Sequence, residues 1–216
     1  MSGISTTDLK LLIKASYDPI MEDVGKYKLD HSLSGQRAKV FFNESNGKAY
    51  IAHRGTKGVQ DVITDTKMIF NYKNNERFNH AQKIQKMAEN KYGKDNVITI
   101  GHSLGASIAS DVGSDSKQII NLNKPVLPSD MLFKDKNKNQ TDINTSYDPV
   151  SFMRSFERKN GNEVNIASQT INPFTEHTAN VLDRLGSNTI IGGSVEYDFM
   201  IRIHKNKKNK LNKNKY

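Results

Sequence analysis

Residues 97–109 read Val-Ile-Thr-Ile-Gly-His-Ser-Leu-Gly-Ala-Ser-Ile-Ala, and this stretch decides the predicted fold. Residues 97–100 are apolar or β-branched, which predicts a short strand buried on both faces. Residues 104 to about 111 predict a helix. Between them, residues 101–105 have the spacing G-x-S-x-G, which is typical of a tight strand-to-helix turn that presents a serine. The stretch therefore predicts that Ser103 is a nucleophile.

Crowding explains the two glycines of this turn. Ser103 must lie at the tip in a strained backbone conformation, and side chains two positions before and after it would collide. Gly101 and Gly105 occupy those positions. We expect the turn to expose the Ser103 hydroxyl at the carboxyl edge of the sheet. The backbone N–H of Leu104, at the start of the helix, would then point toward an oxyanion formed nearby.

The residues on either side alternate between helix and strand patterns. A helix is predicted over residues 5–16, where Ser5 and Asp8 form a capping box. Another is predicted over residues 79–92, with Asn79 as its cap and Gly93 as its end. Further strands are expected at 37–43, 48–53, 118–123, 143–147 and 163–167. Strands separated by helices favour a mostly parallel sheet flanked by helices, so the predicted class is α/β, of the α/β-hydrolase type.

Composition limits the kinds of protein this chain can be. Its 216 residues are enough for one substantial core, and residues 1–201 are predicted to form one domain. The chain has no cysteine, which excludes disulfides, thiolate metal sites and a cysteine nucleophile. Residues 1–10 show no secretory signal, and no stretch is long and apolar enough to span a membrane. We therefore expect an intracellular protein.

Much of the net charge of +9 lies in residues 202–216, which alternate Lys with Asn and contain almost nothing to bury. This composition predicts a disordered basic tail. Such a tail can be simply a solvated end, or it can attract an anionic membrane surface or nucleic acid. No aromatic residue stands between the lysines, so stacking on bases is not indicated and no specific nucleic-acid binding is expected.

A serine nucleophile needs a base, and in this fold the acid and then the base follow the serine along the chain. His177 and His204 lie far enough along to be the base. His204 lies inside the basic tail, where neighbouring cations disfavour its protonation and no packing would hold it. His177 precedes an apolar helical stretch, where a loop can present it, so we predict His177 as the base. The alternative is an ordinary surface histidine.

The acid is expected between the serine and the base. Asp148 stands at the end of a predicted strand and before a proline, where a carboxylate can reach the imidazole over the sheet edge. An Asp-Pro turn with no chemical role is the alternative. Asp130, Asp135 and Asp142 lie in a polar, lysine-rich connection and are poorer candidates.

Four segments in this order resemble the class 3 lipases, α/β-hydrolases that include fungal triacylglycerol lipases and phospholipases A1. Residues 53–56 (His-Arg-Gly-Thr) are similar to the oxyanion-strand motif of that family, and 61–65 to the acidic stretch after it. Residues 101–106 are similar to its elbow, and 148–150 to its acid motif. The resemblance covers roughly residues 5 to 185.

The resemblance implies further roles. Thr56 would supply the second oxyanion donor through its backbone N–H and hydroxyl, beside the N–H of Leu104. Asp65 would help to hold that loop. Residues 66–77 occupy the lid region of the family and form either a short apolar lid or part of the core.

The predicted function is hydrolysis of a carboxylic ester by a serine hydrolase, with a lipid, triacylglycerol or phospholipid, as the favoured substrate. Ser103, His177 and Asp148 would form a triad and pass through an acyl-enzyme. No metal or organic cofactor is expected, because carboxylates and histidines do not converge at metal-ligand spacing and no dinucleotide fingerprint or P-loop is present. The alternatives are an inactive hydrolase-fold binding protein and a basic protein whose tail is the functional part.

Overall fold

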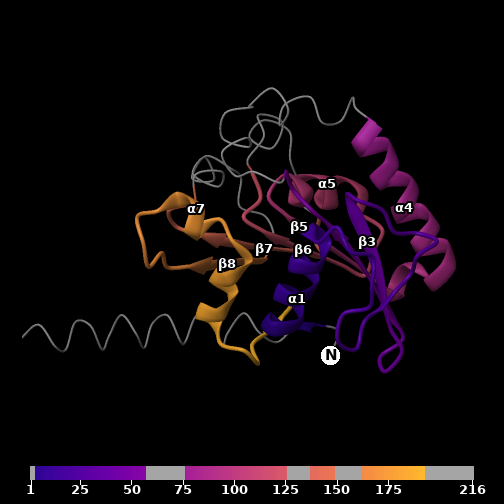
Figure 1. The fold of residues 1–216 in the computed structure, drawn as a ribbon, viewed down its shortest axis with the longest axis horizontal. Helices are drawn as coiled ribbons and strands as arrows, with labels where there is room; N and C mark the ends of the chain where they lie inside the picture. Colours follow the sequence, from indigo (N-terminus) through magenta and orange to yellow (C-terminus); the bar gives the residue numbers. More distant parts are fainter. Residues whose placement is uncertain (1–2, 57–75, 126–136, 149–161, 193–216) are drawn as a thin grey trace, which may run out of the picture.

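A computed structural model of the chain describes residues 3–56, 76–125, 137–148 and 162–192. Their centre is a seven-stranded sheet in the order β2-β3-β4-β5-β6-β7-β8 (Figure 1). Its strands are β2 (Lys28–Leu29), β3 (Ala38–Asn43), β4 (Lys48–His53), β5 (Val97–His102), β6 (Gln118–Leu122), β7 (Gln140–Thr145) and β8 (Asn162–Ile166). A separate two-stranded pair joins β1 (Ile4–Ser5) to β9 (Ile190–Ile191).

The sheet is mostly parallel, as the sequence predicts. Strands β4 to β8 run parallel to one another, whereas the pairs β2–β3 and β3–β4 are antiparallel. The carboxyl ends of β5, β6, β7 and β8 therefore meet at one edge of the sheet. Loops that follow these strands are brought together at that edge, where open α/β sheets bind their ligands.

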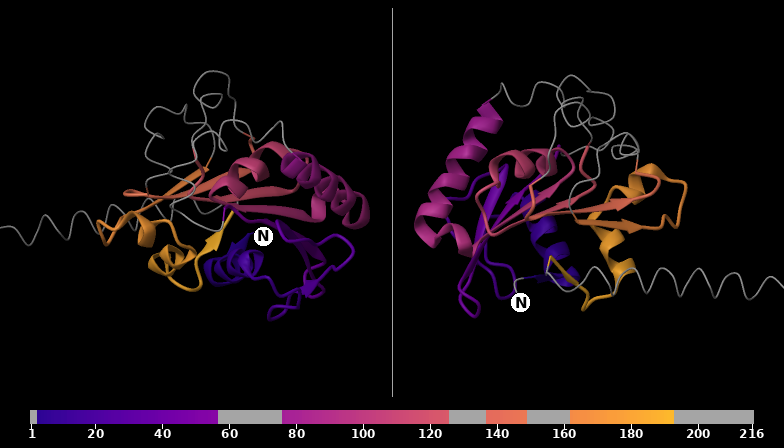
Figure 2. Two further views of the ribbon diagram at one scale, coloured as in Figure 1. Left: turned by 45° about the horizontal axis from the view of Figure 1, so that its top comes forward. Right: turned by 180° about the vertical axis from the view of Figure 1, so that it is seen from behind.

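Helices cover both faces of the sheet. They are α1 (Thr6–Tyr17), α4 (Glu76–Tyr92), α5 (Leu104–Val112) and α7 (Pro173–Glu176), with 3-10 helices η2 (Lys94–Asn96) and η4 (Ala179–Leu185). Figure 2 shows the sheet close to edge-on, with α4 and α5 on one face and α1 and the yellow-orange η4 segment on the other. The described residues thus form three layers, helix, sheet and helix. The loops that follow the parallel strands lie at the carboxyl edge of the middle layer.

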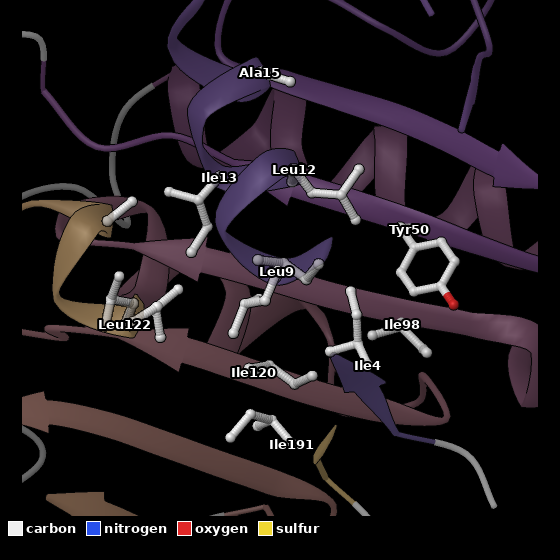
Figure 3. Packing of buried hydrophobic residues seen from close by; sticks show 14 of the residues in the cluster. Ile4, Leu9, Leu12, Ile13, Ala15, Tyr50, Ile98, Ile120, Leu122 and Ile191 are labelled. Atoms are coloured by element: carbon white, nitrogen blue, oxygen red, sulfur yellow. The ribbon is translucent and has the colours of Figure 1, made fainter. Parts of the chain in front are cut away.

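The N-terminal helix is the best-predicted element. Ser5 caps α1 by accepting the N–H of Asp8 over 3.1 Å, as the capping pattern predicts. Leu9, Leu12 and Ile13 lie on one face of this helix and are fully or nearly fully buried. In Figure 3 these side chains lie over Ile98, Ile120 and Leu122 of the central strands (three residues of the same core cluster). Burial of this face fixes α1 across β5 and β6, beside the edge that carries the elbow.

One local prediction, the start of the second predicted helix, is wrong. The cap at Asn79 is wrong because α4 begins earlier, at Glu76, and contains Asn79. The added turn carries Phe78, which packs against Leu104 and Ile108 of α5, and this burial outweighs a side-chain cap. Gly93, with φ +85°, follows the end of the helix as predicted.

A second wrong prediction concerns Asp142, which the sequence placed in a polar connection. It lies inside β7, which begins at Gln140, and is 1% exposed. Its carboxylate accepts hydrogen bonds of 2.8 Å from the side-chain amides of Asn121 and Gln140. The Asp142 carboxylate can be buried in the sheet because these two amides satisfy it.

Several predictions fall outside the described residues. They are the acidic stretch 61–65, residues 66–75 of the lid region, Asp130, Asp135, His204 and the basic segment 202–216. Glu76 and Arg77, the last two residues of the lid region, begin α4. Within the described part of the chain, no helix has the length and apolar character needed to cross a membrane.

Candidate active site

The elbow has the predicted backbone, but the expected exposure of its serine is wrong: Ser103 is 1% exposed, because the loop at Gly55 packs against it. Strand β5 ends at His102, helix α5 begins at Leu104, and Ser103 between them has φ 58° and ψ −133°. Residues other than glycine adopt such a backbone at a cost of about 1–3 kcal/mol, and only where the surroundings impose it. Here the Ser103 N–H donates to the carbonyl of Leu122 over 3.0 Å, and its own carbonyl accepts the Ala106 N–H over 2.8 Å.

The two glycines of the elbow are required by close approach, as the crowding argument predicts. A Cβ atom added at Gly101 would lie 2.4 Å from the Cα of Ala106. At Gly105 it would lie 2.2 Å from the carbonyl oxygen of His53. Both distances are to backbone atoms, which cannot move aside as a flexible side chain can. The glycines therefore let α5 approach β4 and β5 closely enough to hold the turn.

His177 and Asp148 form a buried pair. Each is 1% exposed, so His177 is not the surface histidine of the alternative reading. The Nδ1 atom of His177 is hydrogen-bonded to Oδ2 of Asp148. Across the described ranges 3–56, 76–125, 137–148 and 162–192, no hydrogen-bond partner is found for His177 Nε2 or for Ser103 Oγ. The two atoms that a serine nucleophile and its base would use are thus both buried and not engaged in another hydrogen bond within these ranges.

The loop that carries Thr56 lies directly against the elbow. A Cβ atom added at Gly55 would lie 2.7 Å from Cβ of Ser103. Thr56 itself lines a cavity of about 260 Å³, together with Ile13, Ala179 and His177. This cavity is mostly apolar, and Lys14 is the charged side chain in its wall. A larger surface hollow of about 600 Å³ over α7 and η4 contains none of the predicted site residues.

Solved structures share this arrangement of sheet and helices. The Lip2 lipase of Yarrowia lipolytica has a TM-score of 0.52 at 15% identity, over 80% of each chain. A variant of the Penicillium cyclopium protein MDLA has a TM-score of 0.54 at 15% identity, over 89% of this chain and 85% of that one. A triacylglycerol lipase from Penicillium expansum has a TM-score of 0.52 at 15% identity, over 86% of this chain and 81% of that one. The chain has an α/β-hydrolase fold.

No protein-family model and no curated protein sequence matches the chain, so this likeness is one of fold. Within the α/β-hydrolase fold, the three predicted residues all follow parallel strands. Ser103 follows β5, Asp148 comes just after β7, and His177 lies beyond β8 at the end of α7. Their order along the chain is the order that the fold uses for nucleophile, acid and base.

The loop with His177 is held by a buried ion pair that the sequence did not reveal. Glu176 is fully buried, and its carboxylate accepts two hydrogen bonds from Arg184, of 2.5 and 3.0 Å. It also accepts the backbone N–H groups of Gln169 and Thr170. Burial alone would raise the pKa of Glu176, but these donors lower it overall. The carboxylate therefore stays charged and fixes the residue next to His177.

Asn123 is a second residue that sequence reasoning missed. It follows β6 with φ +50°, a conformation that asparagine tolerates better than most residues. Its side-chain amide donates to the carbonyl of Glu176 over 2.9 Å, and its Oδ1 accepts the N–H of Thr145 over 3.1 Å. One side chain thus joins the end of β7, which leads to Asp148, to the loop that carries His177. The asparagine at a strand end was the only available signal.

Tyr17 and His102 also line the cavity, and neither was predicted as a site residue. The Tyr17 hydroxyl lies 2.7 Å from Nδ1 of His102. Nε2 of His102 lies 2.7 Å from the carbonyl oxygen of His177. In the described ranges, no group of three or more His, Cys, Asp or Glu side chains is placed to hold a metal ion.

Proposed function

We propose that this chain is a serine hydrolase that cleaves carboxylic esters, with Ser103 as nucleophile, His177 as base and Asp148 as the group that orients the base. The observation that carries the proposal is the hydrogen bond between His177 Nδ1 and Asp148. Because the carboxylate accepts the proton on Nδ1, the lone pair of the neutral ring lies on Nε2. That atom has no hydrogen-bond partner among the described residues, and His177 is one of the residues that line the cavity.

The proposed reaction has two halves. His177 Nε2 takes the proton of Ser103 as the hydroxyl oxygen attacks the ester carbonyl, and the protonated ring then gives that proton to the leaving alcohol. Water repeats the sequence on the acyl-enzyme and releases the acid. Asp148 stabilises the imidazolium in both halves without taking its proton.

The oxyanion formed in each half needs hydrogen-bond donors. The N–H of Leu104 is at the start of α5, where it has no acceptor within the helix, and the helix dipole adds a partial positive charge. We assign Thr56 as the second donor, because its loop packs against Ser103. Loss of one such donor typically costs about a hundred- to a thousandfold in rate.

We further propose a lipid ester, triacylglycerol or phospholipid, as the substrate class. The cavity beside His177 is mostly apolar, which suits an acyl chain. The Yarrowia and Penicillium expansum proteins that share the fold are described as a lipase and a triacylglycerol lipase. Both points favour an acyl ester over a small polar substrate.

The test is hydrolysis of p-nitrophenyl esters of increasing chain length by the full chain and by the variant Ser103→Ala. We expect the variant to lose at least about a thousandfold in kcat. Ser107→Ala is the matched control, because it removes a buried hydroxyl from α5, the helix that follows the elbow. Among the described residues this hydroxyl makes a single contact, of 3.5 Å, with the carbonyl of Pro125. Its activity should stay near that of the unaltered chain.

A fluorophosphonate probe separates an active hydrolase from an inactive protein of the same fold. We expect it to label the unaltered chain at Ser103 and to leave Ser103→Ala unlabelled. An unaltered chain that neither hydrolyses any ester of the series nor reacts with the probe would support the inactive alternative.

A further inference from the structure

Hydrogen bonds around His102 join two loops of the candidate site. On one side, Nε2 of His102 lies 2.7 Å from the carbonyl oxygen of His177. On the other, Nδ1 lies 2.7 Å from the hydroxyl of Tyr17. That same hydroxyl accepts the backbone N–H of Gly55 over 2.8 Å. The chain of contacts therefore runs from the loop with Thr56, through α1 and the end of β5, to the loop with His177.

The direction of each hydrogen bond follows from the chemistry of its partners. A carbonyl oxygen can only accept, so Nε2 of His102 must carry the proton. Burial, together with the positive charge that His177 can carry, lowers the pKa of His102 to about 3, so the ring is neutral and Nδ1 accepts. The Tyr17 hydroxyl therefore donates to Nδ1. Burial raises the pKa of Tyr17 to about 12, so this hydroxyl keeps its proton.

Every polar atom in the chain of contacts has a partner, and each bond depends on the next. The Gly55 N–H is taken up by Tyr17, so this contact holds the backbone next to Thr56, the residue that we assign as an oxyanion donor. The ring of His102 lies edge-on to Tyr17, with ring centres 5.5 Å apart, and its centre is 4.9 Å from that of His177. Removing one member leaves the others as buried groups without a partner, which is costly.

We propose that Tyr17 and His102 are positioning residues for ester hydrolysis, which fix the loop with Thr56 and the loop with His177 at a set separation across the Ser103 elbow. The inference rests on the proposed function of the site. Both residues act through other groups: Tyr17 through the backbone of Gly55 and Thr56, and His102 through the backbone of His177. Their loss should therefore lower kcat, because transition-state geometry suffers, while KM changes little.

Substitutions that remove single atoms test this role. Tyr17→Phe deletes only the hydroxyl, and Tyr50→Phe is its control, since Tyr50 is buried in the same core and its hydroxyl bonds to Asn46 over 3.0 Å, away from the site. We expect kcat of Tyr17→Phe to fall on the order of ten- to a hundredfold, with KM within about twofold. Tyr50→Phe should keep the kcat of the unaltered chain, even if its thermal midpoint falls by as much as that of Tyr17→Phe.

The side chain at 102 allows a rescue test. His102→Gln places an N–H donor near the position of Nε2, whereas His102→Leu has no donor. We expect the glutamine variant to recover most of the kcat that the leucine variant loses. Unchanged kcat in Tyr17→Phe, a change confined to KM, or equal losses in the two variants at 102 would each overturn the inference.

A measurement on the unaltered protein needs no activity. In spectra of protein labelled with nitrogen-15 histidine, the signals absent from His102→Gln belong to His102. We expect them to show a neutral ring with the proton on Nε2. A proton on Nδ1 would overturn this inference and leave the proposed function of the site standing. If the unaltered chain hydrolyses no ester, the proposed function fails, and with it the role in hydrolysis, even where the expected tautomer is found.

Discussion

Ser103 is held in its strained conformation by contacts on both sides of the turn. Its N–H bonds to Leu122 of the neighbouring strand, and Gly105 brings the following helix against the backbone of His53. These constraints come from a few adjacent residues, so the sequence alone was sufficient to predict the elbow. The same closeness makes the glycines the most sensitive positions in the site.

Gly105→Ala is expected to destabilise the protein by at least about 2 kcal/mol, because the new methyl group would press on the carbonyl of His53. Urea unfolding followed by fluorescence measures the change. Gly35→Ala is the matched control: its methyl group would have His80 Nε2 as its nearest neighbour, at 3.6 Å, and φ there is not in the left-handed region. Equal stability of the two variants would contradict the crowding argument.

Two buried histidines predict how stability depends on pH. Burial and nearby positive charges lower the pKa of both His53 and His102 to about 3, from the 6.5 of an exposed ring. Between these values the unfolded chain binds protons that the folded chain does not. The free energy of unfolding should therefore be constant above about pH 6.5 and fall below it, by ~1 kcal/mol per pH unit for each residue.

Urea titrations at about pH 7, 6 and 5 test this dependence, and His53→Gln should reduce the slope by roughly half. Carboxylates whose pKa is lowered in the folded chain contribute little in that window, because they titrate below it. The pKa of Asp30, for example, is lowered to about 2. Burial would raise it, but the hydrogen bonds from Lys91, Ser32 and Tyr92 outweigh the effect of burial. A stability that stays flat from pH 7 to 5 would show that the two rings titrate normally.

Other site residues could not be predicted from the sequence. Tyr17 and His102 are 85 residues apart, and Asn123 and Glu176 are 53 apart. No local pattern marks a tyrosine near the end of a helix as the partner of a histidine in a distant strand. Such residues become visible only when the fold has placed them.

At the scale of elements, the loop between β8 and η4 matters most, because it carries His177. Its four-residue helix α7 is too short to be stable alone, so the loop depends on what holds it. Glu176, next to His177, and Arg184, in η4, fix the loop through an ion pair. Their side chains are 0% and 14% exposed. The geometry of the base therefore depends on a contact outside the site.

Arg184→Met should destabilise the protein by about 3–5 kcal/mol, because it leaves the Glu176 carboxylate buried without its cation. It should also lower esterase activity by moving His177. Lys10→Met removes an ion pair with Asp183, whose side chain is 64% exposed, and should cost at most ~1 kcal/mol. Thermal unfolding of both variants gives the comparison, and similar midpoints would contradict the proposed anchor.

Elements were predicted well where apolar residues recur at regular spacing, and poorly where polar residues are buried. The pattern of α1 was sufficient because its buried residues are all on one face. The first half of β7 was missed because Gln140, Thr141 and Asp142 are polar, yet all three are buried within the sheet. Hydropathy alone assigns such residues to a loop.

At the scale of the molecule, charge is unevenly distributed. Residues 202–216 carry seven of the positive charges and no acidic residue, which leaves +2 on residues 1–201, since the total is +9. The segment lies outside the described residues, and its attraction to anionic lipid stays a prediction. Electrostatic attraction of this kind adds roughly 1 kcal/mol per basic residue near the membrane surface.

Removal of residues 202–216 tests that prediction. We expect release of fatty acid from vesicles that contain phosphatidylserine to fall by at least about tenfold. Release from phosphatidylcholine vesicles and hydrolysis of soluble p-nitrophenyl esters should stay the same. Equal rates of the two chains on both kinds of vesicle would rule out a membrane role for the segment.

The pairing of β1 with β9 has a consequence for synthesis. Ile4 pairs with Ile191, and α1 buries its apolar face against strands that leave the ribosome long after it does. Helix α1 is thus made well before the strands against which it packs. Contacts of such long sequence separation slow folding, so the nascent chain is expected to expose Leu9 and Leu12 until the central strands and β9 have been made.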